Sequence, residues 1–251
     1  MSRNIALKIA YDGTHYFGFQ KNNSGISIEE HLEKTLEQIV RHKVVLQAAS
    51  RTDRGVHAYG QVVNFFLEDD AIKLDRLKKS LNGLLSDDVV VREIQEMPHS
   101  FHPTLDSVAK EYHYFVYHDE IIPPFERRYS WHISNRLDLL KMKKAAKKLI
   151  GTHDFSSFRN KNNYVKDKTT VRTIFSIKIE EVESKKICIK INGDNFLYKM
   201  ARNITGTLCY IGKGKLNDNI IEFLLTHPNN RLKAGITAPA SGLFLHKVFY
   251  L

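Results

Sequence analysis

A carboxylate set between two arginines is the part of this sequence best suited to chemistry. In the stretch SRTDRGVH, Asp53 lies between Arg51 and Arg54 and is followed two positions later by Gly55. A cation within about 4–6 Å favours the charged form of a carboxylate, so we expect the arginines to keep Asp53 ionised. A positioned, ionised carboxylate can act as a nucleophile or an electrostatic stabiliser. Aspartate and glycine are also common turn residues, and a solvated turn is the alternative interpretation.

An aromatic strand and a helical arginine are the other two candidates. Alternation over residues 107–118 puts Lys110, Tyr112 and Tyr114 on one strand face. Such a face can stack on nucleic-acid bases if it is open, or it can cover a core or a helix. In residues 195–212, Arg202 lies opposite an apolar helical stripe, facing either water or a cleft. The stripe consists of Phe196, Leu197, Met200, Ile204 and Leu208.

Motifs for metal or nucleotide chemistry are absent from the sequence. The histidines form no H-E-x-x-H or other tight ligand spacing, and neither a P-loop nor a dinucleotide fingerprint occurs. The glycines of GKGKL at 212–216 are typical of the end of a helix. We therefore expect no metal and no cofactor.

The elements that must position these residues follow the same order twice. The first half predicts strands at 5–11, 43–49, 60–67 and 89–97, with helices at 27–40 and 74–85. Ser27 with Glu30 forms a capping box before the first helix. The second half predicts strands at 107–118, 170–183, 185–192 and 242–250, with helices at 137–151, 195–212 and 217–227. The resulting expectation is an α+β protein of two ferredoxin-like β-α-β-β-α-β units, at 1–103 and 104–251, whose antiparallel sheets flank a cleft.

Composition narrows the partner and the compartment. The formal net charge of +10 indicates a polyanionic partner, with nucleic acid first and an acidic membrane surface second. Cys188 and Cys209 lie in apolar patterns and are expected to be reduced core residues. No leader-like or membrane-spanning run is present, so we expect a soluble, cytoplasmic protein with no membrane association. These patterns alone do not specify a reaction.

Five segments in order resemble the tRNA pseudouridine synthase A family. ASRTDRGVHAYGQVVNF is similar to the family's R-T-D-x-G-V-H-A loop, and YDGTHYFGFQ to its Y-D-G-x-x-Y-x-G-W-Q opening. The segments FHPTLDSVAKEYHYFVY, NFLYKMARNITGTL and GLFLHKVFY, with GTHDFSSF and TVRTI between them, follow along nearly the whole chain. Phe19 departs from the usual tryptophan, Ser50 from a frequent glycine and Leu105 from a basic or polar residue.

The resemblance implies a role for each matched residue. Asp53 corresponds to the catalytic aspartate, Tyr112 to the active-site tyrosine that stacks on the target base, and Arg202 to the arginine that pairs with the aspartate. Substrate binding is implied for further residues of the loop, and for one apolar residue near the C-terminal end that the pattern does not single out. The loop residues are Arg51, Thr52, Gly55 and His57, and the apolar candidates are Leu243 and Leu245.

The resemblance also implies the reaction and the partners. Members of the family convert uridines 38, 39 and 40 of the tRNA anticodon arm to pseudouridine without a cofactor, and they work as homodimers. Two alternatives compete. A non-catalytic RNA-binding protein fits the topology, but neither half contains the K/R-G-F/Y-G/A-F-V-x-F/Y motif. A hydrolytic glycosidase would need a second carboxylate near Asp53, and no matched segment supplies one.

Overall fold

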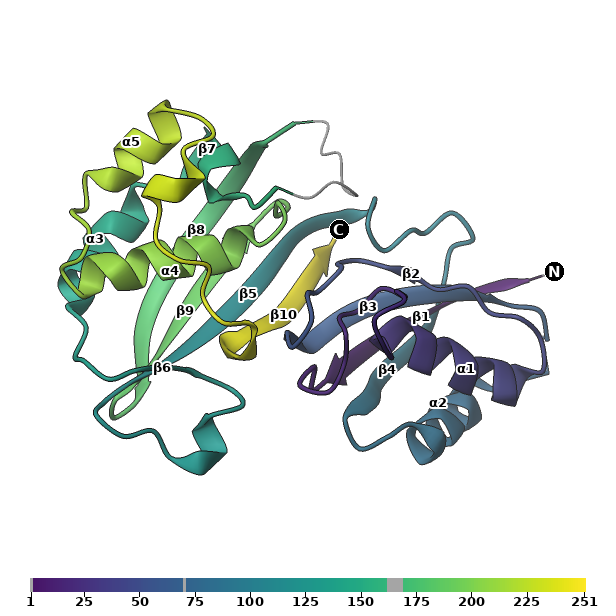
Figure 1. Cartoon of the computed structure of the whole chain (residues 1–251). Helices are drawn as coiled ribbons and strands as arrows, with labels where there is room; N and C mark the ends of the chain where they lie inside the picture. Colours follow the sequence, from purple (N-terminus) through teal and green to yellow (C-terminus); the bar gives the residue numbers. More distant parts are fainter. Residues whose placement is uncertain (1, 70, 162–168) are drawn as a thin grey trace. The chain divides into compact units, whose positions relative to one another are not determined.

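A computed structural model describes residues 2–69, 71–161 and 169–251 (Figure 1). These residues form a mixed α/β protein, as the sequence predicts in its broad class, and they divide into two compact units. The first unit comprises Met1–Val108 and Phe244–Leu251, and the second comprises Ala109–Leu243. The basic run NKNNYVKDK at 160–168 is a candidate for phosphate contacts in the sequence, and most of it lies outside the described residues. No helix in the described part of the chain is both long and apolar enough to cross a membrane.

The first unit is built on strands β4, β1, β3 and β10, in that order. Strand β1 (Arg3–Tyr11) pairs antiparallel with both β3 (His57–Leu67) and β4 (Val89–Met97), while β10 (Leu243–Tyr250) runs parallel to β3. The short strand β2 (Gln47–Ala48) also pairs with β3. Helices α1 (Ile28–Val40) and α2 (Leu74–Leu84) lie side by side and pack on this sheet (Figure 1).

The start of α1 follows the sequence prediction in one of its two capping bonds. The Ser27 hydroxyl accepts from the Glu30 N–H at 3.1 Å, so Ser27 is the N-cap residue. The Glu30 carboxylate accepts from Lys34, one turn further along, at 2.6 Å. The cap therefore fixes where the helix begins, while Glu30 stabilises its exposed surface.

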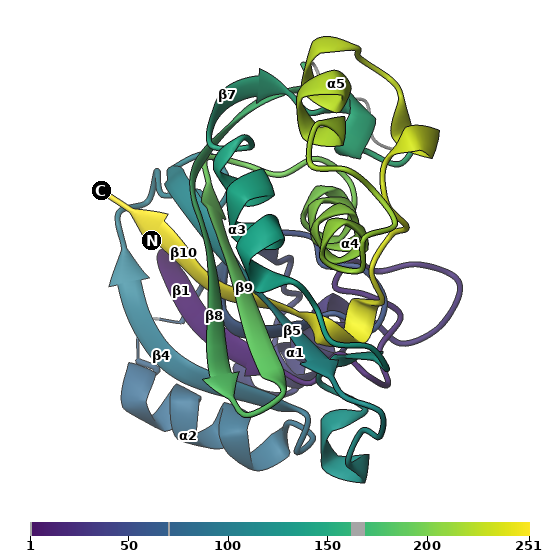
Figure 2. The ribbon, with the colours of Figure 1, turned by 90° about the vertical axis from the view of Figure 1, so that its left-hand side faces the viewer.

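The second unit contains the strand order β5-β9-β8-β7. Antiparallel pairs join β5 (Ser107–His118) to β9 (Lys186–Gly193), β9 to β8 (Val171–Glu183), and β8 to β7 (Gly151–Asp154). The short strand β6 (Trp131–Ile133) runs parallel to β5. Figure 2 shows α3 (Leu139–Lys147) and α4 (Met200–Gly212) side by side against β8 and β9, with α5 (Ile220–Thr226) beyond them.

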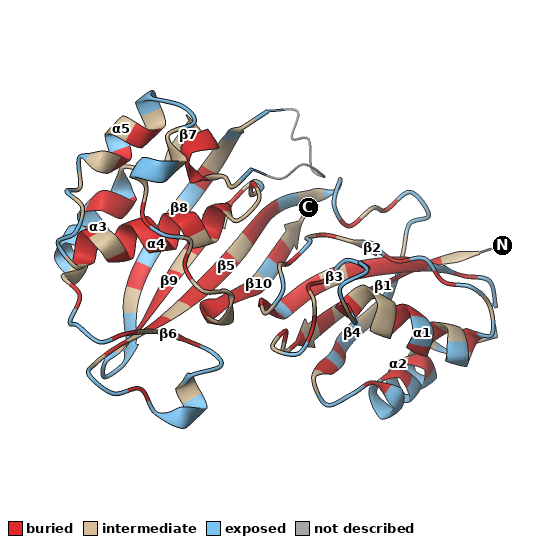
Figure 3. Ribbon diagram, in the orientation of Figure 1, coloured by how far each residue is buried: buried red, intermediate tan, exposed pale blue. Residues whose placement is uncertain are grey.

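Burial identifies the core of each unit (Figure 3). In the first unit it includes Ile5, Leu7, Ile9, Leu32 and Leu36, which the predicted strand and helix stripes contain. In the second unit α4 is buried on nearly all sides, so Thr205, predicted to face away from the apolar stripe, has no exposed surface. Both cysteines are buried, and burial raises the pKa of the Cys188 and Cys209 thiols to about 12.

Two predicted elements differ from the structure. The expected strand at 43–49 is reduced to Gln47–Ala48, because the N–H groups of Val44 and Leu46 donate to glutamate side chains of α1 and not to a neighbouring strand. The helix predicted from residue 195 begins at Met200, because Lys199 adopts a left-handed conformation with φ of 60°.

Candidate functional site

Asp53 lies in the loop between β2 and β3, at the start of a tight turn. The N–H of Val56 donates to the Asp53 carbonyl at 3.1 Å, and Gly55 between them has a φ of 75°, a conformation that favours glycine. The turn interpretation of this stretch is therefore right about the backbone. The Asp53 side chain, however, is half-buried and does not lie fully in solvent. The stretch therefore forms a turn whose aspartate is partly buried.

The segment Tyr11–Phe19 holds this loop in place. The Tyr11 hydroxyl lies 2.7 Å from the Thr52 hydroxyl, and the Phe19 N–H donates to the Thr52 carbonyl at 3.0 Å. Thr52 is only 8% exposed. Its side chain and its backbone are thus both bound by the preceding segment, which fixes the residue immediately before Asp53.

Two glycines allow that close contact. A β-carbon on Gly13 would lie 2.0 Å from the Val56 carbonyl oxygen, which is far inside van der Waals contact. Gly18, with φ of 96°, would bring a β-carbon to 3.1 Å from the Thr52 oxygen. The sequence predicts Asp12-Gly13 as the end of the first strand and includes both glycines in the family resemblance, but it does not predict their contact with the Asp53 loop.

His57 closes the far end of the loop. Its ring is 1% exposed, and its Nδ1 accepts from the Gly13 N–H at 3.1 Å. The same nitrogen lies 3.0 Å from the Asp12 carboxylate. The ring also stacks on Phe244, with centroids 4.5 Å apart. His57 therefore connects the loop to β10 and to the segment after β1.

The near end of the loop is closed by a buried amide. Gln61, which has no exposed surface, donates to the Ser50 carbonyl at 2.5 Å and accepts from the Ser50 N–H at 3.2 Å. The Gln61 side-chain amide thus bonds both the N–H and the carbonyl of Ser50, as a residue of a neighbouring strand would. Gln61 was not singled out from the sequence, because an isolated glutamine in a strand carries no distinguishing pattern.

The arginines beside Asp53 are both exposed but differ in their surroundings. The Arg54 guanidinium lies over the Phe17 ring, 4.0 Å from its centroid, in a cation–π contact. Arg51 lies two residues before Asp53, and its side chain is exposed. Arg54 therefore packs against the Tyr11–Phe19 segment, while the Arg51 side chain lies in solvent.

In the second unit, Tyr112 lies on a covered face of β5. Its ring is 7% exposed and meets Phe196 edge to face, with centroids 4.9 Å apart. On the same face, Tyr114 is fully buried and its hydroxyl donates to the Pro239 carbonyl at 2.8 Å. Both tyrosines are buried, as expected if these aromatics cover a core, and Tyr112 is slightly more exposed than Tyr114.

Lys110 shares this face and is unusually buried for a lysine. It is 3% exposed, and its ammonium donates to the Asn195 side-chain oxygen at 3.0 Å. Burial, with a smaller contribution from the nearby Arg172 guanidinium, lowers the pKa of Lys110 to about 8, and Asp194 opposes this shift. The sequence pattern placed Lys110 beside Tyr112 but gave no indication of its burial.

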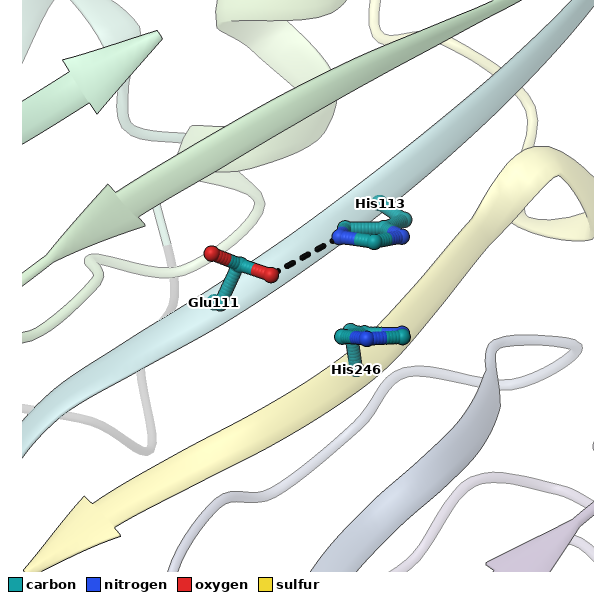
Figure 4. A group of neighbouring side chains, drawn as sticks. All are labelled: Glu111, His113 and His246. Carbon is teal, nitrogen blue, oxygen red and sulfur yellow. Dashed lines mark hydrogen bonds and ion pairs between the residues drawn. The ribbon is translucent and has the colours of Figure 1, made fainter. Parts of the chain in front are cut away.

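The opposite face of β5 carries a histidine–glutamate pair (Figure 4). His113 Nε2 lies 2.8 Å from the Glu111 carboxylate. Burial lowers the pKa of His113, and the hydrogen bond to Glu111 opposes that effect. Because adjacent residues of a strand point to opposite faces, this pair points away from the face that carries Tyr112.

Arg202 lies in the first turn of α4 and is half-buried. Its Nε donates to the Ala238 carbonyl at 2.8 Å, and the Ala238 N–H donates back to the Arg202 carbonyl at 3.2 Å. A cation in the first turn opposes the helix macrodipole, typically by about 0.3–1 kcal/mol. The position therefore indicates a role other than helix stability. The helical wheel predicted that Arg202 faces either water or a cleft. Its side chain is partly buried, so it does not lie fully in water.

The two apolar candidates near the C-terminal end are both buried. Leu243 is 5% exposed and Leu245 has no exposed surface. Leu245 pairs with Ala58 in the parallel β10–β3 ladder, one residue beyond His57. Both leucines therefore occupy the strand that adjoins the end of the Asp53 loop.

The sequence matches known proteins along almost its whole length. A family model described as tRNA pseudouridine synthase matches residues 8–106 and 145–251. The protein named tRNA pseudouridine synthase A 2 of Protochlamydia amoebophila (strain UWE25) is 49% identical over 248 residues, covering 99% of this chain and 94% of that protein. The proteins named tRNA pseudouridine synthase A of Acetivibrio thermocellus and Thermoanaerobacter sp. (strain X514) are 41% and 40% identical, each over 99% of this chain and all of the relative.

Proposed function

Since this chain belongs to the tRNA pseudouridine synthase family, we propose that Asp53 carries out the family's reaction on the anticodon stem-loop, at uridines 38, 39 and 40. The resemblance read from the sequence is confirmed, and the chain is an isomerase that converts uridine in tRNA to pseudouridine. The choice of target positions and the roles of individual residues belong to the proposal.

One observation carries the assignment of Asp53. Its loop is fixed from both ends and along its backbone, by Gln61, by His57 and by the Tyr11 segment. Such support holds a side chain in one geometry, as catalysis by positioned groups requires. An ordinary surface turn needs no buried amide, buried histidine and glycine contact around it.

The proposed mechanism begins with extrusion of the uridine. A base inside a helical stem cannot present its glycosidic bond, and unstacking it costs a few kcal/mol that pocket contacts offset. Tyr112 would contact the extruded uracil, since one base–aromatic contact contributes about 1–3 kcal/mol. Arg202 would pair with Asp53 and keep the carboxylate ionised.

The chemical step exchanges one bond for another. Asp53 either attacks C1′ of the ribose and forms an ester, or removes a sugar proton, and the bond between N1 of uracil and C1′ breaks with its electron pair leaving on the uracil. The uracil then rotates, and a bond forms between C5 and C1′ while the ester bond breaks or the sugar proton is returned by Asp53. The proton on C5 leaves to Tyr112 or to water, and N1 takes up a proton from solvent. Atoms and electrons balance without any redox partner, so we propose that the reaction needs no cofactor and no metal.

Substrate contacts are proposed for the exposed side of the loop. Arg51 would grip the extruded nucleotide or its phosphate, and Gly55 would leave room for the approach of the RNA backbone. Leu243 or Leu245 would form the apolar wall beside the base. For Thr52 and His57, which hold the loop through their side chains, we propose binding through the loop geometry that they maintain.

We also propose how the two units and two copies of the chain are arranged around the RNA. Two ferredoxin-like units, whose mainly antiparallel sheets flank a central cleft, would bind the anticodon arm, and two copies of the chain would form a homodimer in the cytoplasm. The net charge of +10 supports phosphate binding, including by the lysines of the exposed face of α3.

Mapping pseudouridines on a tRNA transcript incubated with the pure protein tests the proposed specificity. We expect modification at uridines 38, 39 and 40, and none in a transcript whose three target positions are cytidines. Modification confined to another arm of the tRNA would contradict the proposed target.

A further inference from the structure

Arg202 depends for its orientation on a segment that has little regular structure of its own. Its Nε donates to the Ala238 carbonyl, and residues 234–239 lie between a short 3-10 turn at Arg231–Lys233 and another at Ala240–Gly242. Ala238 lies in neither a strand nor a helix, and its N–H donates to the Arg202 carbonyl of α4 at 3.2 Å. The position of its carbonyl therefore depends on how the whole segment is held against α4.

The segment lies directly on the backbone of α4. A β-carbon on Gly206 would stand 1.8 Å from the Ile236 carbonyl oxygen, and one on Gly235 would stand 2.5 Å from the Gly206 oxygen. The Gly235 N–H also donates to the Thr207 hydroxyl at 3.1 Å. These atoms leave no room for a side chain, so the segment packs backbone against backbone on α4.

Arg231 ties the segment to α4 with four hydrogen bonds. Its guanidinium donates to the Gly235 carbonyl at 2.7 Å and to the Thr237 hydroxyl at 2.9 Å, both within the segment. It also donates to the side-chain oxygens of Asn203 at 2.8 Å and Asn160 at 3.1 Å. All four acceptors are neutral oxygens. Burial lowers the pKa of Arg231, because removing a charged guanidinium from water costs free energy.

Asn203 links this cluster to the residue next to it on α4. It has no exposed surface, its oxygen also accepts from Thr237 at 2.7 Å, and its nitrogen donates to the Phe158 carbonyl at 2.7 Å. Asn203 directly follows Arg202 in the chain. One guanidinium therefore fixes both the helix turn that carries Arg202 and the segment that orients its side chain.

We propose that Arg231 is a positioning residue for the pseudouridine synthase reaction, acting through Arg202. The inference rests on the proposed role of Arg202 in holding Asp53. Arg231 contacts neither the reacting atoms nor the RNA in this role. Its planar fork binds several oxygens at once, which a lysine ammonium at the same place does not reproduce.

A double-mutant cycle separates positioning from a general effect on folding. The variants are Arg202→Ala, Arg231→Lys and the two combined, with Arg136→Lys at an exposed site as the control. Single-turnover pseudouridine formation at saturating tRNA is measured, together with tRNA affinity and the thermal midpoint. We expect Arg202→Ala to slow the reaction about 10²–10³-fold, in the range of other transition-state stabilising groups. Arg231→Lys should slow it about tenfold, with tRNA affinity and the Arg136→Lys rate unchanged.

The combined variant decides the question. If Arg231 acts through Arg202, adding Arg231→Lys to Arg202→Ala slows the reaction no further, because the group that was positioned is already gone. A further tenfold loss in the double variant, or full activity in Arg231→Lys, would overturn the inference. Full activity of Arg202→Ala by itself would refute the proposed role of Arg202, and that failure is visible without any Arg231 variant.

A milder variant keeps the test decisive if Arg231→Lys does not fold. Thr237→Val removes one acceptor of Arg231 and one donor to Asn203 while keeping the side-chain shape. We expect a smaller loss of rate that again disappears in the Arg202→Ala background. A loss that persists in that background would contradict the inference.

Discussion

Gly13 and Val56 lie so close that a β-carbon on the glycine would stand 2.0 Å from the Val56 carbonyl oxygen. Val56 is also the residue whose N–H closes the turn at Asp53. The segment after β1 and the loop that carries the candidate carboxylate are therefore packed backbone against backbone. The position of Asp53 depends on the absence of a side chain forty residues earlier.

Replacing Gly13 with alanine should displace the Asp53 loop. A misplacement of about 1 Å can lower a rate about 10²-fold, and we expect a loss of that order in single-turnover pseudouridine formation. Gly83→Ala is the matched control, because Gly83 lies in α2 with nothing within 4 Å of its β-carbon position. That control should retain full activity and gain about 0.5–1 kcal/mol of stability. Equal activity of the two variants would show that the close contact does not matter.

The Tyr11–Thr52 pair should show strong coupling in stability. Tyr11→Phe or Thr52→Val alone removes one partner of a buried bond of 2.7 Å, and should each lower the free energy of unfolding by about 1–3 kcal/mol. Because removing both partners leaves no hydroxyl unpaired by the change, the double variant should lose less than the sum. Urea unfolding of the four proteins measures this, and strict additivity would argue against the bond.

Lys110 should make stability depend on alkaline pH. Its folded-state pKa of about 8 lies below the ordinary value of 10.5, so the unfolded chain binds more protons between these values. Stability from this group therefore rises with pH across that window, by at most about 1.4 kcal/mol per pH unit, and the burial penalty is fully present below pH 8. The variant Lys110→Met has no ionisable group at this position, so its stability should not show this pH dependence. The unfolding free energy of the wild type, minus that of the variant, should increase from about pH 8 toward pH 10.5, and a constant difference would contradict the assignment.

Binding of tRNA should weaken steeply with salt. If six to ten phosphates are contacted, affinity should fall about 10³–10⁵-fold between 50 and 200 mM salt. The slope of log affinity against log salt counts the contacts, and Arg51→Gln should reduce it by about one if Arg51 grips a phosphate. A shallow slope would indicate that the positive charge of the chain is not used for binding.

The hydrophobic patterns of short segments predicted most helices and strands, but not which strands pair with one another. The stripe with Leu32 and Leu36 predicts α1, and alternation predicts β1 and β5, because each pattern shows which face of the element is buried. Alternation also suggested a strand at 43–49, where Val44 and Leu46 are indeed buried. There the N–H groups are satisfied by Glu33 and Glu37, an interaction between distant residues that no short pattern contains.

The residues that hold the candidate site in place were the hardest to predict from the sequence. Asp53 was found from its neighbours and from the family resemblance, and no pattern pointed to Gln61, Arg231 or Asn203. Gln61 and Asn203 are buried and Arg231 is half-buried, and each makes a hydrogen bond to a residue at least eleven positions away in the chain. The parallel pairing of β10 with β3 at His57 is equally non-local, since periodicity reports burial and not the neighbouring strand.

Release of tritium from tRNA labelled at C5 of uridine, measured for Asp53→Asn, tests the central assignment most directly. The asparagine keeps the size of the side chain and removes its charge. The proposal expects unchanged tRNA affinity and thermal midpoint, with no tritium release above the background of a protein-free control. Release at the wild-type rate would show that the Asp53 carboxylate does not carry the reaction.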